Sequence, residues 1–153
     1  MAINADQLAA GITLAHSCLT QGRFKDSEIL IEGLITLQSD NPYLYMLLGS
    51  ALLQQGRLDE SVASFDRAIE ISPENISALT NRGEIHLKQG RLKEAAADLK
   101  RASSLDQKGD DPFANRARLL IEMTSSLLKV ADEKGMAAVD QARQQILTQV
   151  KQS

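Results

Sequence analysis

Few side chains in this sequence combine the types and spacings that catalysis requires. His16 and Cys18 are close in the chain, and a paired imidazole and thiolate could act as base and nucleophile. Residues two apart on a helix point about 200° from one another, so this pair cannot form locally. Cys18 lies instead on an apolar stripe, which predicts a small buried core residue. His86, which lies in an equivalent position further along the chain, is also predicted to be a packing residue.

The remaining candidates for chemistry also favour structural roles. Asp110 and Asp111 could bind a cation, but acids before Pro112 are typical of a helix start. The sequence contains no phosphate-binding glycine loop, paired-histidine zinc motif or nucleophile elbow. Its single cysteine excludes an intramolecular disulfide and a cysteine-based zinc site. We therefore expect no enzyme activity, no metal and no cofactor.

Composition indicates one globular domain over residues 1–153, because 43% of residues are apolar and 24% are charged. A net charge of −3 argues against a dedicated nucleic-acid binder. The longest apolar run, Tyr43 to Leu48, is far shorter than the roughly 20 residues of a membrane span. The first residues lack the basic and apolar pattern of a secretion signal, so a cytoplasmic location is expected.

Charge varies along the chain, and its basic part is the segment 76–109. The bases there include Arg91, Lys93, Lys100 and Arg101, mostly on one expected helix. No aromatic side chains accompany them for stacking on bases. We interpret this cluster as a solvated helix face.

A repeat is the most informative feature of the sequence. Gln21-Gly22-Arg23 recurs as Gln55-Gly56-Arg57 and as Gln89-Gly90-Arg91, each time after 34 residues. A period of 34 is typical of tetratricopeptide repeats. The middle repeat carries the whole pattern of that family in register, namely Tyr45, Leu48, Gly49, Leu52, Gly56, Ser61, Phe65, Ala68 and Pro73. The chain thus resembles the tetratricopeptide repeat family, although Leu34 replaces the usual Ala in the first repeat and Gln107 the usual Pro in the third.

The resemblance implies an all-α fold, a right-handed superhelix of three helix pairs with C-terminal capping helices. The repeats span about 8–41, 42–75 and 76–109, and the cap spans 110–151. We expect repeat helices at 5–21, 24–38, 42–55, 58–71, 76–89 and 92–105, with each glycine ending a first helix. In the cap, an apolar stripe predicts a helix that stops at Lys134-Gly135; its members are Phe113, Ala117, Leu120, Thr124, Leu127 and Ala131.

The end of the sequence predicts one more amphipathic helix. Met136, Val139, Ile146 and Val150 form its apolar stripe, which Arg143 interrupts. This helix either caps its own chain or mediates self-association, for example as a homodimer.

A second stripe runs along the first helix of each repeat, about 130° round from the core stripe at 100° per residue. In the tetratricopeptide family this face lines the concave groove that usually holds the ligand. The resemblance therefore implies a partner-binding groove, to which we assign Ile12, His16, Leu19, Tyr43, Met46, Ser50, Leu53, Thr80, Glu84, Leu87 and Arg118.

The groove is expected to bind a protein or peptide segment, extended or helical, through apolar anchors. Glu84 and Arg118 would set the orientation of that segment. Some family members hold a C-terminal carboxylate with Lys and Asn side chains, but this chain has Ile12, His16, Met46 and Ser50 at those places, so such a clamp is not expected. The function predicted is that of a protein-binding adaptor or chaperone.

The layout also resembles the small translocator chaperones of bacterial type III secretion systems. The stretch from Leu87 to Ala95 and the later Asp111-Pro112-Phe113 carry this resemblance. It implies binding of an apolar-anchored segment of a secreted partner, with self-association. Two alternatives stay open: neighbouring helices or the N-terminal segment cover the groove, or the chain is a structural subunit that assembles through its convex face or last helix.

Overall fold

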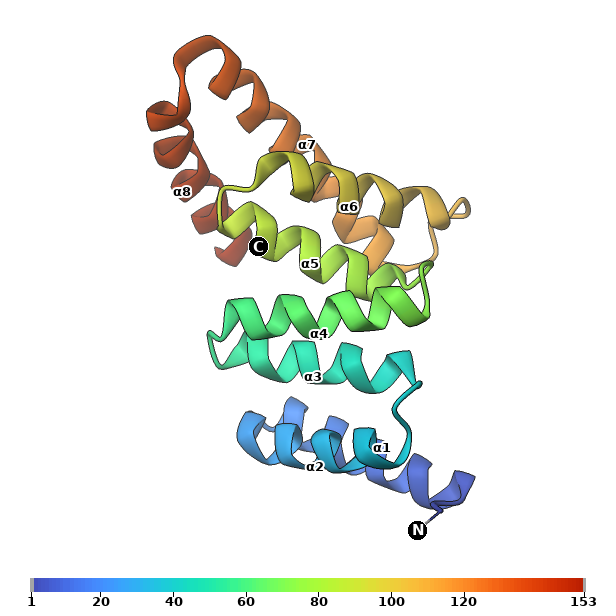
Figure 1. Ribbon diagram of the computed structural model, residues 1–153. Helices are drawn as coiled ribbons and strands as arrows, with labels where there is room; N and C mark the ends of the chain where they lie inside the picture. The colour runs from blue at the N-terminus through green and yellow to red at the C-terminus, as the bar shows by residue number, and fades with distance from the viewer. Residues whose placement is uncertain (1, 153) are drawn as a thin grey trace. The chain divides into compact units, whose positions relative to one another are not determined.

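The computed structural model describes residues 2–152, apart from the side chain of Val150, and every regular element in that range is an α-helix (Figure 1). The all-α prediction is confirmed, and each of the six expected repeat helices agrees with the structure to within one residue at either end. The helices are α1 (Ala5–Thr20), α2 (Phe24–Leu37), α3 (Pro42–Gln54), α4 (Leu58–Ile71), α5 (Ile76–Lys88), α6 (Leu92–Leu105), α7 (Pro112–Lys134) and α8 (Met136–Gln152).

The chain forms two compact units, of which the first ends at Ala78 and the second begins at Leu79. In the first unit, α1 packs on α2, α2 on α3, and α3 on α4. In the second, α6 packs on α7 and α7 on α8. Each pair is a helical hairpin or a contact between successive hairpins, which is how helix pairs bury faces that none could bury alone.

The Gln-Gly-Arg turns adopt one backbone conformation. Gly22, Gly56 and Gly90 have φ values of 76°, 74° and 76°. This left-handed region carries little penalty for glycine, which explains its recurrence here. In each turn the N–H of the following arginine donates to the carbonyl five residues back; the pairs are Arg23 with Cys18 (2.8 Å), Arg57 with Leu52 (3.0 Å) and Arg91 with His86 (2.8 Å). The turns therefore close with local bonds.

The arginine of each turn also holds the start of the second helix. Arg23, Arg57 and Arg91 occupy the N-cap position but make no side-chain cap bond. Their guanidinium groups instead pair with an acid three residues on, in the pairs Arg23–Asp26, Arg57–Glu60 and Arg91–Glu94. An acid in the first turn suits the positive end of a helix. Sequence reasoning did not assign this role to the arginines.

Small residues let paired helices approach closely. An added Cβ at Gly49 would lie 2.7 Å from the ring of Phe65, and one at Gly83 would lie 2.8 Å from Leu99. A serine of the second helix bonds to the first helix in the first two hairpins: Ser27 donates to the carbonyl of Ala15 (2.8 Å) and Ser61 to that of Gly49 (2.7 Å).

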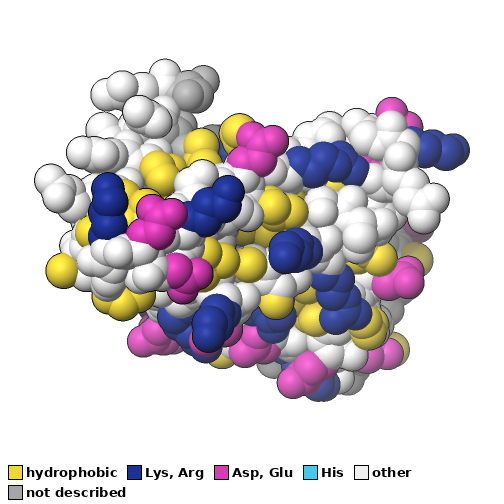
Figure 2. Space-filling model, turned by 90° about the horizontal axis from the view of Figure 1, so that it is seen from above, with side chains coloured by type: hydrophobic (Ala, Val, Ile, Leu, Met, Phe, Trp, Pro, Cys, Tyr) yellow, Lys and Arg dark blue, Asp and Glu magenta, His cyan; other side chains and the backbone are white. Residues whose placement is uncertain are grey.

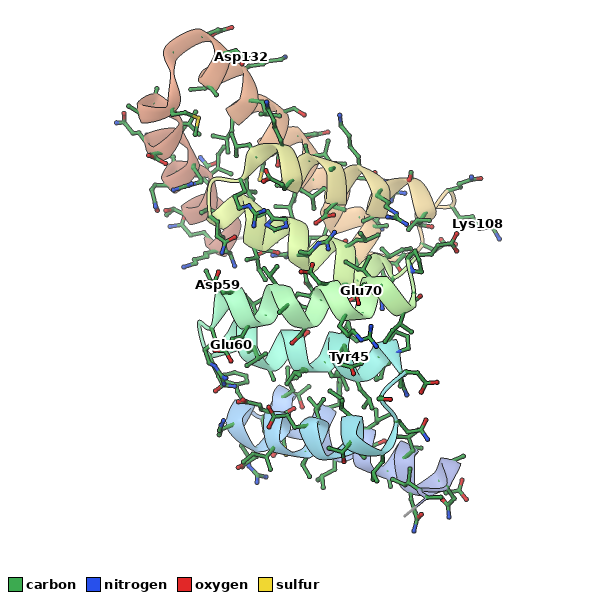
Figure 3. All side chains as sticks on the ribbon, in the orientation of Figure 1. Tyr45, Asp59, Glu60, Glu70, Lys108 and Asp132 are labelled. Carbon is green, nitrogen blue, oxygen red and sulfur yellow. The ribbon has the colours of Figure 1, made fainter. Side chains whose placement is uncertain are left out.

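Tyr45 stands at the edge of the α3–α4 hairpin. Its hydroxyl donates to the carbonyl of Ser39 at 3.0 Å. The guanidinium of Arg67 lies 5.9 Å from the ring centroid and pairs with Glu70 at 2.9 Å (Figure 3). This cation–π contact adds a modest stabilisation at an exposed site.

The cap begins as predicted, because the Asp111 carboxylate accepts the backbone N–H groups of Phe113 and Ala114 at the start of α7. The predicted stripe is buried at its centre, over Ala117, Leu120, Thr124 and Leu127, while Phe113 is exposed. In Figure 3, Lys108 lies just before the start of α7 and Asp132 near its far end. Val139 of α8 is buried, and the prediction for the Val150 side chain lies outside the described part.

Candidate functional site

The groove positions of the first unit come from two helices that contact one another, α1 and α3. Ile12, Leu19, Met46 and Leu53 are half-buried, and Tyr43 is 42% exposed. Ile12 and Met46 rest on the core cluster around Ala15, Ile31 and Leu44. The face thus presents apolar side chains that are supported from below and open to solvent above.

Polar side chains sit beside this apolar face. His16 is exposed, and Ser50 is half-buried with its hydroxyl donating to the carbonyl of Met46 at 3.0 Å. Neither residue lies within a ligand set, since no three His, Cys, Asp or Glu side chains converge on a metal site anywhere in residues 2–152. Cys18 is buried, as predicted. What this surface can do chemically is bury a partner's apolar side chains.

The groove positions of the second unit differ from the prediction. Thr80 and Leu87 of α5 are fully buried, so neither lies on an open surface. Thr80 donates to the carbonyl of Phe113, which places the start of α7 over it at 3.2 Å. The expectation that these two residues line an open groove is therefore wrong for this structure, because both side chains are buried.

Glu84 is the centre of a charged cluster. Its carboxylate pairs with Arg116 of α7 at 2.9 Å and with Lys88 of α5 at 3.2 Å. Burial raises the pKa of Glu84, but the hydrogen bond from Arg116 and the charge of Lys88 outweigh it and hold the pKa below its ordinary value. Glu84 is therefore ionised at neutral pH.

Arg118, the other residue expected to orient a partner, bonds away from Glu84. Arg116 and Arg118 are about 200° apart on α7, so only one of them can face α5. Arg118 points the other way, where it bonds to the Ser103 carbonyl and to both the carbonyl and the side chain of Asp106. It clasps the loop between α6 and α7. Sequence reasoning missed Arg116, although the Glu84–Lys88 spacing indicates a charged face.

A cavity of about 300 Å³ lies against the Glu84 cluster in the second unit. Three helices contribute to it: α5 with Glu84 and Lys88, α7 with Arg116, and α8 with Gln144, Leu147, Thr148 and Lys151. Three basic side chains thus surround one acid, and α8 forms one wall.

A second polar cluster joins α5 to α6. Arg82 holds the Asp98 carboxylate with two bonds, of 2.8 and 2.6 Å. The buried His86 has its Nε2 3.8 Å from the same carboxylate. Burial and the charge of Arg91 lower the pKa of His86 more than Asp98 raises it. His86 is thus a neutral packing residue, as predicted.

Surface charge is mixed rather than concentrated. Figure 2 shows Lys and Arg side chains beside Asp and Glu side chains on the face seen from above, with apolar side chains between them. The basic residues Lys93, Lys100 and Arg101 are exposed on α6, consistent with a solvated face. In the described part of the chain, no helix has the length and apolar character to cross a bilayer.

Comparison with known proteins agrees with this fold. Family models described as TPR repeat and tetratricopeptide repeat match residues 49–90 and 76–108. The predicted resemblance to tetratricopeptide repeat proteins is confirmed. A search of curated protein sequences gave no match.

Solved structures of both predicted kinds share the fold. The type III secretion chaperone SycD of Yersinia enterocolitica, in complex with a peptide of the translocator YopD, is similar with a TM-score of 0.74, 19% identity, and coverage of 85% of this chain and 98% of that one. The Sgt2 TPR domain of Aspergillus fumigatus has a TM-score of 0.76 at 12% identity, with coverage of 88% and 87%. The first TPR of Spaghetti (RPAP3), bound to the HSP90 peptide SRMEEVD, has a TM-score of 0.74 at 16% identity, with coverage of 84% and 98%.

Proposed function

We propose that this chain is a protein-binding adaptor or chaperone without catalytic activity, whose α1–α3 face holds an apolar-anchored segment of a partner. The observation that carries the proposal is that the apolar side chains assigned to this face are not buried in the core of two helices that contact one another: Ile12, Leu19, Met46 and Leu53 are half-buried, and Tyr43 is exposed. Burial of a partner's leucine-sized side chain there would contribute roughly 1.5–3 kcal/mol. Structures of similar fold were solved with a YopD peptide and an HSP90 peptide, which supports peptide binding as the use of this fold.

Within that role, a translocator chaperone is the finer proposal. SycD supports it through its fold and through the peptide with which it was solved. The absence of Lys and Asn from the clamp positions of α1 and α3 favours apolar anchoring over the capture of a C-terminal carboxylate.

The test is a selection from a displayed random-peptide library, followed by affinity measurement on the selected peptides. We expect peptides with two or more large apolar residues, and Met46→Glu with Leu53→Glu should weaken their binding at least tenfold. Equal binding by this double variant, with an unchanged helical circular dichroism spectrum, would contradict the proposal.

A second apolar surface supplies a matched control and an alternative. Leu14 and Ile29 are 53% and 57% exposed beside a cavity of about 310 Å³ on the α1–α2 hairpin. This patch favours an assembly role, because exposed apolar patches mark contact surfaces. The variant Leu14→Glu with Ile29→Glu adds the same charge and should leave peptide binding unchanged. If Leu14→Glu with Ile29→Glu abolishes peptide binding instead, the patch around Leu14 and Ile29 is the interaction surface.

A further inference from the structure

The last helix of the second unit, α8, lies against a cavity that two other helices also line. α8 packs on α7 and forms one wall of the cavity whose other walls are α5 and α7. In Figure 1 α8 folds back so that its end comes beside α5. Leu87 of α5, expected on an open face, is fully buried. We call the surface of α5 and α7 that faces this cavity the inner face of the unit, and α8 covers it there.

α8 uses a single stripe for this contact. Val139 is buried, and Ala142, Arg143 and Ile146 are half-buried at successive turns of the same side. Ala137, Gln141 and Gln145 on other sides are exposed. Anchors at i, i+3 or i+4, and i+7 are how an amphipathic helix docks into a groove of another protein.

Near the middle of α8, Arg143 is packed against the rest of the second unit without a full set of polar partners. Arg143 is only 15% exposed, and its Nε is buried without a hydrogen-bond partner. Its guanidinium pairs with Asp140, which is on the same helix and 66% exposed, at 3.1 Å. Its Nη1 would lie 2.2 Å from a Cβ added at Gly90, so the guanidinium lies directly against the α5–α6 turn. A buried charge with so few partners opposes docking.

The charges that line the cavity are a second feature that disfavours the docking of α8. Lys151 of α8 lines the same cavity as Lys88 and Arg116, where Glu84 is the one acid among the lining residues. Like charges at close range disfavour one another. A helix with an acidic side chain in place of Lys151 would complement this cavity better than α8 does.

The connection to α8 is a single residue. α7 ends at Lys134 and α8 begins at Met136, so Gly135 alone joins them. Its φ is 79°, and a Cβ built on it would meet no atom within 4 Å. Because the space beside the Gly135 Cα is open, rotation about this joint need not disturb α7.

We propose that α8 is a displaceable internal ligand, and that the inner face of the second unit binds an acidic amphipathic helix of a partner once α8 has moved away. Tethering by one residue gives α8 a high effective concentration, so it would weaken partner binding without blocking it. This proposal concerns a different face from α1–α3, and either can fail without the other.

The test uses the full chain and a labelled synthetic peptide of residues 136–152 as the probe. The release variant is Val139→Asp with Ile146→Asp, and the control, Ala137→Asp with Gln145→Asp, puts the same charge on exposed positions of α8. We expect the release variant to bind the peptide at least tenfold more tightly than the wild type or the control does. A peptide with Lys151→Glu should bind severalfold more tightly still, with a gain that shrinks as salt is added.

Hydrogen exchange of the wild-type chain provides an independent measurement. The amides of α8 should exchange at least tenfold faster than those of α6 and the first half of α7, because α8 opens alone. The proposal is overturned if α8 exchanges together with those helices, if the release variant loses protection throughout the second unit, or if a release variant that keeps this protection does not bind the peptide.

Discussion

Arg57 reaches back from the turn before α4 to Glu28 of α2, where its Nη1 lies 2.7 Å from the Glu28 Oε1. The Glu28 side chain is 3% exposed. Its other oxygen accepts from Gln55 at 2.9 Å and pairs with Lys25 at 3.1 Å. This buried carboxylate, with its three donors, links the first two repeats. The link stabilises the protein only while Glu28 is charged.

This link predicts how stability depends on pH. Burial of Glu28 raises its pKa, but the bonds from Gln55, Arg57 and Lys25 outweigh burial and lower the pKa from 4.5 to about 2. The stabilisation is therefore complete above pH 4.5 and is lost as the pH falls towards 2. Urea unfolding should show that Glu28→Gln flattens this part of the stability profile. The exposed Glu74→Gln should leave the profile unchanged, and an unchanged profile in Glu28→Gln would refute the link.

The crossing of α3 and α4 predicts a strong effect of one methyl group. A Cβ at Gly49 would meet the Phe65 ring at 2.7 Å, and the buried ring has little room to move. Gly49→Ala should destabilise the protein by about 2 kcal/mol in thermal or urea unfolding. Gly33→Ala is the matched control, since nothing lies within 4 Å of its added Cβ. The control should stabilise by up to about 1 kcal/mol; losses of equal size in both variants would show that the contact is not the cause.

The Arg82–Asp98 pair predicts that removal of the acid destabilises the packing of α5 on α6, because two charge-assisted hydrogen bonds are lost. Asp98→Ala should lower the free energy of unfolding by about 1.5–3 kcal/mol. Because the charge of Asp98 raises the pKa of His86, the same change should lower that pKa further, which an NMR titration can follow. The exposed Asp132→Ala should be close to neutral. A His86 titration that does not move in Asp98→Ala would rule out the coupling.

The bonds of Arg118 predict that the loop between α6 and α7 becomes more mobile when this residue is replaced. Asp106 accepts the backbone N–H groups of Gly109 and Asp111, and Arg118 holds Asp106 in place. Arg118→Met should therefore accelerate hydrogen exchange at these two amides and cost about 1–2 kcal/mol. Arg118→Lys should rescue only part of the loss, because a lysine cannot reproduce the guanidinium fork. Full protection of the Gly109 and Asp111 amides in Arg118→Met would show that the loop keeps its conformation without Arg118.

Much of the fold follows from local rules that the sequence displays directly. Helix ends at Gly22, Gly56 and Gly90 depend on backbone conformation alone, so their positions could be predicted. The departure at Leu34 is explained by packing between α1 and α2: a Cβ at Gly11 would lie 2.8 Å from the Leu34 side chain, so the glycine makes room for the larger residue.

The site of the second unit could not be predicted in the same way. The cavity beside Glu84 depends on where α8 returns, and that depends on the direction of the chain after one glycine. The choice between Arg116 and Arg118 as the partner of Glu84 depends on the rotation of α7, which helical periodicity leaves undetermined. Periodicity names the residues of a face, but tertiary packing decides what covers it.

Because the Gln-Gly-Arg turns share one conformation, each stretch between two of them begins and ends with the same turn geometry. Each turn is closed by bonds within about five residues, such as that from Arg57 to Leu52, so its geometry needs no other repeat. An in-frame duplication of the 34 residues from Arg23 to Gly56 would recreate the same junction at both ends. Unequal recombination at these points could therefore lengthen the array by whole hairpins, with no new turn to be invented.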